Sequence, residues 1–402
     1  MEIETIKSNS SVKWEMVKIE NLCTIVRGSS PRPQGDPRYY IGNVPRLMIE
    51  DLTRDGKYVT PQVDSLTEEG AKLSRPMKKG DLVITVSGRT GVPAILNVDC
   101  CIHDGFVGFR DLSSDVNIDY LFHYLNSLTT ITSAQAVGAI FKNLTTEQLK
   151  NIQIPLPPLP VQKRIAEILD AADALRRKDQ ELLKKYDELA QAIFIDMFGD
   201  PVKNEKGWEC LVGEDYANRI SVGVVIKPAS YYVKEGIPAL RSQNIRPNRI
   251  TKDNLVYFSE ETNNTILHKS KIFTGDVLIV RTGQPGTAAV VEEDMNGINC
   301  IDMLIVSPKK EIISPYYLAF FLNSNAGKNY IISNQKGQIQ QHFNVGDINK
   351  FKIPVPPIAF QLKFEHILLN LKNQLSNDII RQSDSLFQTL LQKAFKGELV
   401  AE

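Results

Sequence analysis

The hydrophobic positions between residues 161 and 193 follow the spacing of a long helix with one narrow apolar seam. They recur at alternating steps of four and three residues, with one polar position at Asp179, which is the pattern of a coiled-coil helix. Gly199 and Pro201 follow, and these residues end helices. A rod of about 37 residues would be roughly 55 Å long, since each residue adds 1.5 Å. The seam consists of Val161, Ile165, Ile168, Ala172, Leu175, Leu182, Tyr186, Leu189 and Ile193.

A proline-rich segment leads into this helix and recurs near the C-terminus. Ile154 to Pro158 reads Ile-Pro-Leu-Pro-Pro, and Ile353 to Pro357 reads Ile-Pro-Val-Pro-Pro at an offset of 199 residues. Proline lacks an amide proton and fixes its own φ, so each segment is expected to be a stiff extended arm. Gln361 repeats Gln162 at the same offset, and a second apolar seam runs from Phe360 to Ala394. This spacing predicts a duplicated unit of one domain and one helix.

The segments between the helices also match one another. Each contains an apolar, β-branched run after a Gly-Asp turn, at 80–86 and 275–280, which is typical of a buried strand. A polar glycine loop, a second strand and a short helix follow in both halves. We therefore expect an α+β fold with two similar strand-rich domains and two long antiparallel coiled-coil helices, related by a pseudo-twofold axis. The expected boundaries are 1–151 and 202–350 for the domains, and 152–201 and 351–402 for the arms with their helices.

Composition narrows the class of protein without identifying it. The chain has 402 residues and a hydrophobic fraction of 42%, which is ordinary for a globular protein of about two or three domains. It has no run of 18 apolar residues and no signal-peptide pattern, so we expect a cytoplasmic protein without a membrane partner. Five scattered cysteines fit a reducing compartment. The formal net charge is zero, which does not favour nucleic-acid binding unless local patches or a partner supply the phosphate contacts.

The sequence contains none of the patterns that indicate a catalytic or metal site. It has no G-x-x-x-x-G-K-S/T phosphate loop, no G-x-G-x-x-G after a strand, no H-E-x-x-H and no paired Cys spacing. The five histidines are scattered. Asp55-Gly56-Lys57 resembles the end of a nuclease carboxylate–lysine motif, but no suitably placed upstream Asp or repeat partner accompanies it. We therefore expect a binding protein with no catalytic residue, metal or cofactor of its own.

The proline–Gln–helix cassette, present twice, resembles that of the specificity subunits of type I restriction–modification systems. The resemblance rests on Ile152 to Gln162, on Ile353 to Pro357 with Gln361, on the Gly-Asp strands and on the Trp-Glu pairs at 14–15 and 208–209. It covers nearly the whole chain. It implies a non-catalytic, sequence-specific DNA-binding subunit in a host-defence restriction system. Each of its two target-recognition domains would read one half of a bipartite double-stranded DNA target.

The resemblance also implies protein partners for the helices. In the family, the long helices set the unread spacer and bind two methyltransferase subunits, which restriction subunits with nuclease and translocase activity join. Those partners, and not this chain, would use S-adenosylmethionine, ATP and Mg²⁺. The second seam is less regular beyond Leu375, so the two helices need not bind partners equally. The helix positions expected at the partner surface are Val161, Ile165, Ile168, Phe360, Phe364 and Ile367.

Polar side chains in the matched loops are the candidates for DNA contact. The forked donor of Arg suits guanine and the amide of Gln suits adenine, each with about 1–3 kcal/mol of discrimination, while other contacts touch only phosphate. The two scaffolds match but these side chains differ, which favours two related, distinct half-sites. The candidates are Arg27, Ser30, Arg32, Arg89 and Lys142 in the first half, and Lys227, Arg241, Gln243, Arg281, Gln284, Lys336, Gln338 and Gln340 in the second.

Two other functions stay open at this point. One is a two-domain coiled-coil adaptor that makes no contact with DNA. The other is a self-contained nuclease, against which the missing metal-ligand and carboxylate pattern argues.

Overall fold

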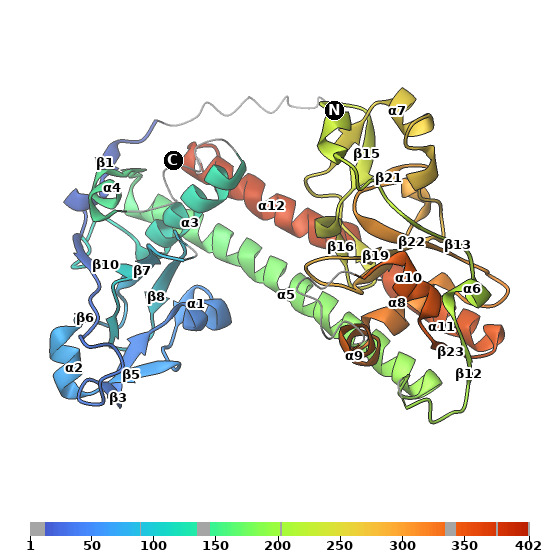
Figure 1. The fold of residues 1–402 in the computed structure, drawn as a ribbon. Helices are drawn as coiled ribbons and strands as arrows, with labels where there is room; N and C mark the ends of the chain where they lie inside the picture. The colour runs from blue at the N-terminus through green and yellow to red at the C-terminus, as the bar shows by residue number, and fades with distance from the viewer. Residues whose placement is uncertain are drawn as a thin grey trace, which may run out of the picture. The chain divides into compact units, whose positions relative to one another are not determined.

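The computed structural model describes residues 13–88, 90–134, 145–201, 203–333, 343–374 and 377–400. The chain forms two compact units: unit 1 comprises residues 1–180 and 378–402, and unit 2 comprises residues 181–377. Each unit therefore contains one globular domain together with parts of the long helices of both cassettes. The elements of both units are labelled in Figure 1.

Unit 1 is built on two sheets that share a hydrophobic core. The first has the strand order β2-β10-β7-β8-β4 and the second the order β5-β3-β9-β6. Neighbours are antiparallel except for the parallel pairs β4–β8 and β3–β9. The strands are β2 (Thr24–Arg27), β3 (Tyr40–Leu47), β4 (Tyr58–Val59), β5 (Asp64–Leu66), β6 (Arg75–Met77), β7 (Leu82–Thr85), β8 (Pro93–Leu96), β9 (Cys100–Ile102) and β10 (Phe106–Arg110), and the helices of this domain are α1 (Ile49–Asp55), α2 (Glu68–Leu73), α3 (Ile118–Ala134) and α4 (Thr146–Asn151).

The apolar run of β7 is buried because both of its faces are covered. Side chains alternate along a strand, so Leu82 and Ile84 join a core with helix α3 and the long helices. Val83 points the other way, into a core shared with strands β3, β6 and β9 of the second sheet. A strand covered on both faces is a continuous apolar run instead of an alternating one. This is the pattern that the sequence predicted at 80–86.

Unit 2 repeats this plan. Its central sheet has the order β13-β22-β19-β20, and a second sheet has the order β14-β18-β15-β21. Val277 and Ile279 face the helix side, while Leu278 and Val280 face the second sheet. The strands are β13 (Ala217–Val222), β14 (Tyr232–Val233), β15 (Ile237–Leu240), β16 (Ile245–Arg246), β17 (Arg249–Ile250), β18 (Val256–Phe258), β19 (Val277–Val280), β20 (Ala288–Val290), β21 (Asn299–Cys300) and β22 (Met303–Pro308), and the helices are α6 (Gly213–Tyr216), α7 (Glu260–Asn264), α8 (Pro315–Asn323), α9 (Asn325–Ser333) and α10 (Val345–Lys350). The prediction of an α+β fold with two similar strand-rich domains is confirmed.

Each proline arm forms a short strand that closes its own domain. In unit 1, β11 (Gln153–Pro155) pairs antiparallel with β1 (Met16–Lys18). In unit 2, β23 (Ile353–Val355) pairs antiparallel with β12 (Glu209–Leu211). Each pair stands alone as a two-stranded sheet. Such a position tolerates proline because only one edge of the strand is needed for pairing.

The repeated glutamine ties the start of each long helix to its domain. Gln162 is fully buried; its Nε2 donates to the carbonyl oxygens of Asp115 and Pro157, both at 2.8 Å, and its Oε1 accepts from the backbone N–H of Asn117 at 2.8 Å. Gln361, also fully buried, makes the same set of bonds with Ile312, Pro356 and Ser314. An amide has both a donor and an acceptor, so one side chain satisfies several buried backbone groups at once.

The long helices are shared between the units. Helix α5 (Leu159–Phe198) has 40 residues, or about 60 Å of rise, and the boundary between the units falls within it. The second cassette is described as α11 (Ile358–Gln374), in unit 2, and α12 (Asn377–Phe395), in unit 1. None of the helices in the described ranges is long and apolar enough to cross a membrane.

Within each unit the two helix segments run antiparallel. In unit 1, Arg176 of α5 lies 3.8 Å from Asp384 of α12, while Phe395 at the end of α12 contacts Tyr120. The hydroxyl of Tyr120 in turn donates to the Pro155 carbonyl, just ahead of α5. In unit 2, Phe364 of α11 contacts Phe194 and Phe198 near the end of α5 (ring centroids 5.4 and 5.5 Å apart). Since 364 lies near the start of α11, this pair is also antiparallel.

Each domain core is closed by the end of the helix that follows the other domain in sequence. Phe194 of α5 stacks on Tyr317 of unit 2 with ring centroids 5.5 Å apart. Phe395 of α12 lies 5.1 Å from the ring of Tyr124 of unit 1. Phe194 and Phe395 were matched as repeat positions in the sequence, so the two contacts are equivalent.

Candidate nucleic-acid interface

Three of the predicted DNA-contact residues of unit 1 converge on Asp104, which lies in the turn between β9 and β10. Ser30 Oγ donates to Asp104 Oδ1 at 2.7 Å, and Arg32 Nη2 lies 3.9 Å from Oδ2. Arg27 Nη2 donates to the Asp104 carbonyl oxygen at 3.3 Å. The hydrogen bond from Ser30 is the main reason why the pKa of Asp104 lies below its usual value. The side chains of Arg32 and Asp104 are 68% and 56% exposed, so this cluster is open to a ligand.

Unit 2 has an equivalent aspartate at the equivalent turn. Asp302 lies between β21 and β22, and Arg281 Nη1 donates to its Oδ1 at 2.8 Å. Arg281 Nε also donates to the Phe343 carbonyl at 3.3 Å. Both units thus hold a guanidinium group beside a carboxylate at the end of the central sheet, although the arginines come from different loops.

A glycine lets the loop after the first strand pass against this turn in both units. A Cβ on Gly28 would lie 2.0 Å from the His103 carbonyl oxygen, and one on Gly223 would lie 2.4 Å from the Cys300 carbonyl oxygen. Ser29 N–H donates to the Ile102 carbonyl at 3.1 Å in unit 1. This close approach brings the loop with Ser30 and Arg32 next to Asp104. The Gly in these loops is required by contact between two backbones.

The other predicted residues of unit 2 lie in separate loops. Lys227 is exposed and has a left-handed backbone with φ of +43°. Gln243 is exposed, and Gln284 is exposed in the turn between β19 and β20. Arg241 is held by a hydrogen bond from its Nη2 to the Asn254 carbonyl. No contact joins these four side chains to the Arg281–Asp302 pair among the described residues. Arg89, Lys142, Lys336, Gln338 and Gln340 lie outside the described residues.

The helix positions expected at a partner surface have different exposures. Ile165 and Phe364 are fully buried in the cores of units 1 and 2, so the prediction that they face a partner is corrected: their side chains have no surface to offer. Val161, Ile168 and Ile367 are partly buried, and Phe360 is 51% exposed. The predicted seam also differs from the buried stripe, because its members Leu175, Leu182 and Leu189 are 46%, 45% and 46% exposed.

Sequence reasoning missed Asp104 and Asp302 because it searched the loops only for donors to DNA. The available signal was the repeated run Cys-Ile before an Asp, at 101–104 and 300–302. Lys57, noted for its resemblance to a nuclease motif, is a buried residue that pairs with Asp119 and Asp170. Within the described ranges, no group of three or more His, Cys, Asp or Glu side chains could hold a metal ion.

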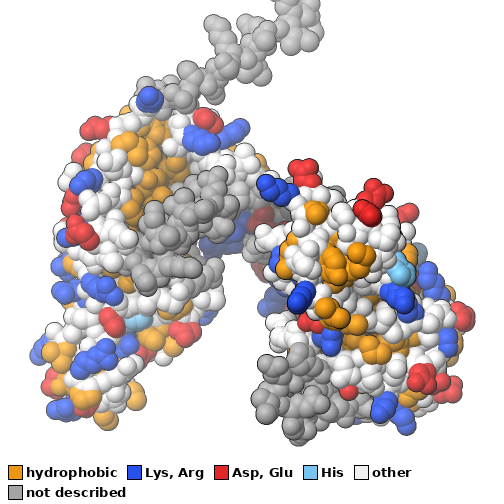
Figure 2. All heavy atoms as spheres, turned by 45° about the horizontal axis from the view of Figure 1, so that its top comes forward, with side chains coloured by type: hydrophobic (Ala, Val, Ile, Leu, Met, Phe, Trp, Pro, Cys, Tyr) orange, Lys and Arg blue, Asp and Glu red, His pale blue; other side chains and the backbone are white. Residues whose placement is uncertain are grey.

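The surface charge is mixed in sign. Figure 2 shows Lys and Arg side chains interspersed with Asp and Glu on the visible face of each unit, without one uniformly basic surface. This agrees with the formal net charge of zero. Phosphate contacts by this chain alone are therefore local.

Comparison with known proteins identifies the class to which this fold belongs. The family model for the type I restriction modification DNA specificity domain matches residues 11–185 and 223–382. The specificity subunit of the type I restriction enzyme MjaIX from Methanocaldococcus jannaschii is 24% identical over 416 residues, which cover 97% of this chain and 94% of the relative. The EcoBI specificity subunit from Escherichia coli is 25% identical over 343 residues, 77% of this chain and 70% of the relative.

A solved structure has the same fold. The crystal structure of the S subunit of a type I restriction–modification system from M. genitalium superposes with a TM-score of 0.54 at 15% identity, over 97% of this chain and 98% of that chain. The chain belongs to the family of type I restriction modification DNA specificity domain proteins, since the family model covers most of its length. The resemblance noted in the sequence is confirmed.

Proposed function

We propose that this chain is the DNA-binding specificity subunit of a type I restriction–modification complex, in which each globular domain reads one half of a bipartite target. The observation that carries this proposal is the duplicated scaffold with unlike loop side chains. Unit 1 places Arg27, Ser30 and Arg32 around Asp104, whereas unit 2 places Arg281 beside Asp302 and presents Gln284 in the neighbouring turn. Two equal frames with different donors suit two different half-sites.

The carboxylates prepare the arginines for recognition. An Arg fork that is already oriented loses less conformational freedom when it binds the edge of a guanine. Asp104 also opposes approach of a phosphate to the same spot, because two negative charges repel. The cluster therefore favours a base edge over the backbone. Lys227 has no such carboxylate partner among the described contacts and suits a positioning contact with phosphate.

The long helices give the complex its spacing and its protein contacts. Leu175, Leu182 and Leu189 of α5 are spaced by seven residues, and each leaves about half of its side chain exposed. Single exposed leucines are common, but a heptad series on one helix is typical of a helix–helix interface. We assign these leucines, with Phe360 of α11, to docking of the methyltransferase subunits. Those subunits, and the restriction subunits that join them, carry the catalysis, the S-adenosylmethionine, the ATP and the Mg²⁺ in the cytoplasm.

Selection of DNA by the assembled complex tests this function. The chain is combined with its methyltransferase subunits and incubated with random DNA duplexes, and the bound fraction is sequenced. We expect two short specified blocks separated by a fixed unspecified spacer. A bound pool with no specified sequence, or with one continuous block, would contradict the proposal.

A further inference from the structure

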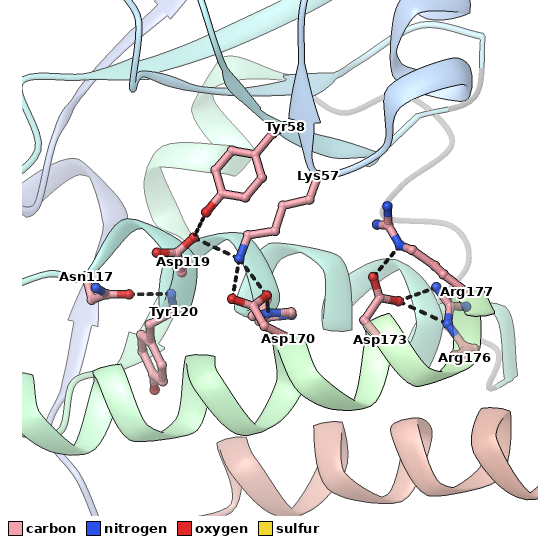
Figure 3. Close-up of polar contacts among 10 residues, drawn as sticks. Lys57, Tyr58, Asn117, Asp119, Tyr120, Asp170, Asp173, Arg176 and Arg177 are labelled. Atoms are coloured by element: carbon pink, nitrogen blue, oxygen red, sulfur yellow. Dashed lines mark hydrogen bonds and ion pairs between the residues drawn. The ribbon is translucent and has the colours of Figure 1, made fainter. Parts of the chain in front are cut away.

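Lys57 is a buried cation that connects two helices of unit 1. Its Nζ lies 2.8 Å from Asp119 Oδ1 of α3, and 2.6 and 2.8 Å from the two carboxylate oxygens of Asp170 of α5. Tyr58 Oη donates to Asp119 Oδ1 at 2.6 Å, and His123 Nε2 lies 2.8 Å from Asp170 Oδ1. Figure 3 shows the Lys57 side chain reaching from the strand side down between the two carboxylates. The side chain of Lys57 is only 9% exposed.

The turn before Lys57 lies directly on helix α5. Gly56 has φ of +78°, and a Cβ there would lie 2.6 Å from Arg177 Nη1. Arg177 is held in turn by Asp173, with Nε donating to Oδ2 at 2.7 Å. The turn thus spans α5 from Asp170 to Arg177, two turns of helix. These polar contacts fix both the position of α5 along its axis and its rotation against the first domain.

The matching place in unit 2 has a different chemistry. Asp119 and His123 correspond to Tyr316 and Phe320, and Asp170 corresponds to Leu369, by the repeat offsets of 197 and 199 residues. These three residues line a cavity of about 100 Å³ beside α5. The cation there is Arg249, which meets Asp187 of α5 at 3.1 Å in a pair whose side chains are 31% and 53% exposed. Unit 2 therefore has one half-exposed ion pair and apolar contacts where unit 1 has a buried ionic network.

The two kinds of contact differ in how far they tolerate sliding. Moving α5 by one residue shifts it by about 1.5 Å, which is enough to break hydrogen bonds of the length seen at Lys57. A buried ammonium without its carboxylates is strongly unfavourable, so a buried ion pair restricts geometry even where it adds little stability. Apolar contacts have no direction and allow small shifts.

We propose that Lys57 is a positioning residue that fixes the direction and register of α5 on the first recognition domain, and thereby restricts the spacer length that the complex accepts. This inference rests on the proposed function, in which the helices hold two DNA-reading domains. Because one base pair adds about 3.4 Å to a duplex, a shift of two or three helix residues equals about one base pair. The joint in unit 1 is the stiff one, and that in unit 2 the compliant one.

The test compares methylation of DNA targets that share both half-sites but differ in spacer length, from about two base pairs shorter to about two longer. The complex with methyltransferase subunits is assembled with wild-type chain or with the triple variant Lys57→Met, Asp119→Tyr and Asp170→Leu. This variant gives unit 1 the residues of unit 2 at the two carboxylate positions and leaves no unpaired charge from the three side chains. We expect it to methylate neighbouring spacer lengths about tenfold better, relative to the preferred one, than wild type does. The half-site sequences stay the same.

Two further variants keep the test decisive. Asp170→Asn removes one charge from a position that is 42% exposed, so it preserves folding better than the triple variant and should broaden the spacer preference in the same direction. Arg249→Met is the matched control in unit 2 and should change the preference by less than about twofold, as a half-exposed pair does. An unchanged spacer preference in the folded triple variant and in Asp170→Asn overturns the proposal, and so does equal broadening by Arg249→Met. If wild type itself shows no spacer preference, the proposed function fails instead.

Discussion

At the scale of single residues, backbone contact and charge pairing account for the shape of the loops. Gly28 permits the first-domain loop to pass against the turn that contains Asp104, and Gly223 does so in the second domain. Asp104 then holds Ser30 and Arg32 from one side. The sequence marked the glycines and the donors as repeated loop residues, but it could not show the acceptor, because Asp104 is 74 residues from Ser30.

The clearest residue-scale prediction concerns Gly28→Ala. The added methyl group would lie 2.0 Å from the His103 carbonyl oxygen, so the two backbones must separate. We expect the free energy of unfolding of the chain to fall by about 1–3 kcal/mol, as measured by chemical denaturation. Gly346→Ala is the control, since the only atom within 4 Å of its Cβ is the flexible Asn344 Oδ1 at 3.3 Å, and it should be neutral within about 0.5 kcal/mol. A loss no larger for Gly28→Ala than for the control would show that the loop does not need this close approach.

At the scale of elements, the repeated Gln and the proline arms were predicted and the faces of the long helices were not. Gln162 and Gln361 stood out because the same residue recurs at the same offset, and both fasten a helix start. The helix seam was ambiguous because α5 carries two apolar stripes. Leu169 and Phe194 lie in buried cores, whereas Leu182 is 45% exposed, and hydrophobicity alone cannot separate a core from a surface that a partner covers.

The element-scale prediction is that helix length determines spacer length. Four residues inserted into α5 between the units, together with four in the second helical cassette, add about 6 Å of rise. This is close to two base pairs at about 3.4 Å each. Methylation mapping in cells that carry the complete system should therefore find the same half-sites with a spacer longer by about two base pairs. An unchanged site in a folded, active double insertion would show that another element sets the spacing.

At the scale of the whole molecule, duplication was visible in the sequence but the sharing of parts between the units was not. The helix that follows the first domain ends on the core of the second through Phe194, and the helix that follows the second ends on the core of the first through Phe395. Contacts between residues so far apart leave no periodic signal. The same holds for Lys57, which is 113 residues from Asp170. The chain therefore behaves as two composite units, and a change in either long helix is expected to affect more than the domain that precedes it.

The most direct test of the account compares the methylated sites of two single variants in cells that carry the complete system. Arg32→Ala alters the Asp104 cluster of unit 1, and Gln284→Ala alters the exposed β19–β20 turn of unit 2. Removal of one base contact costs about 1–3 kcal/mol of discrimination. The account predicts that each variant relaxes one half-site, that the two variants relax different halves, and that the spacer stays unchanged. Relaxation of the same half by both variants, or of both halves by either one, would contradict the claim that the two units read the two halves separately.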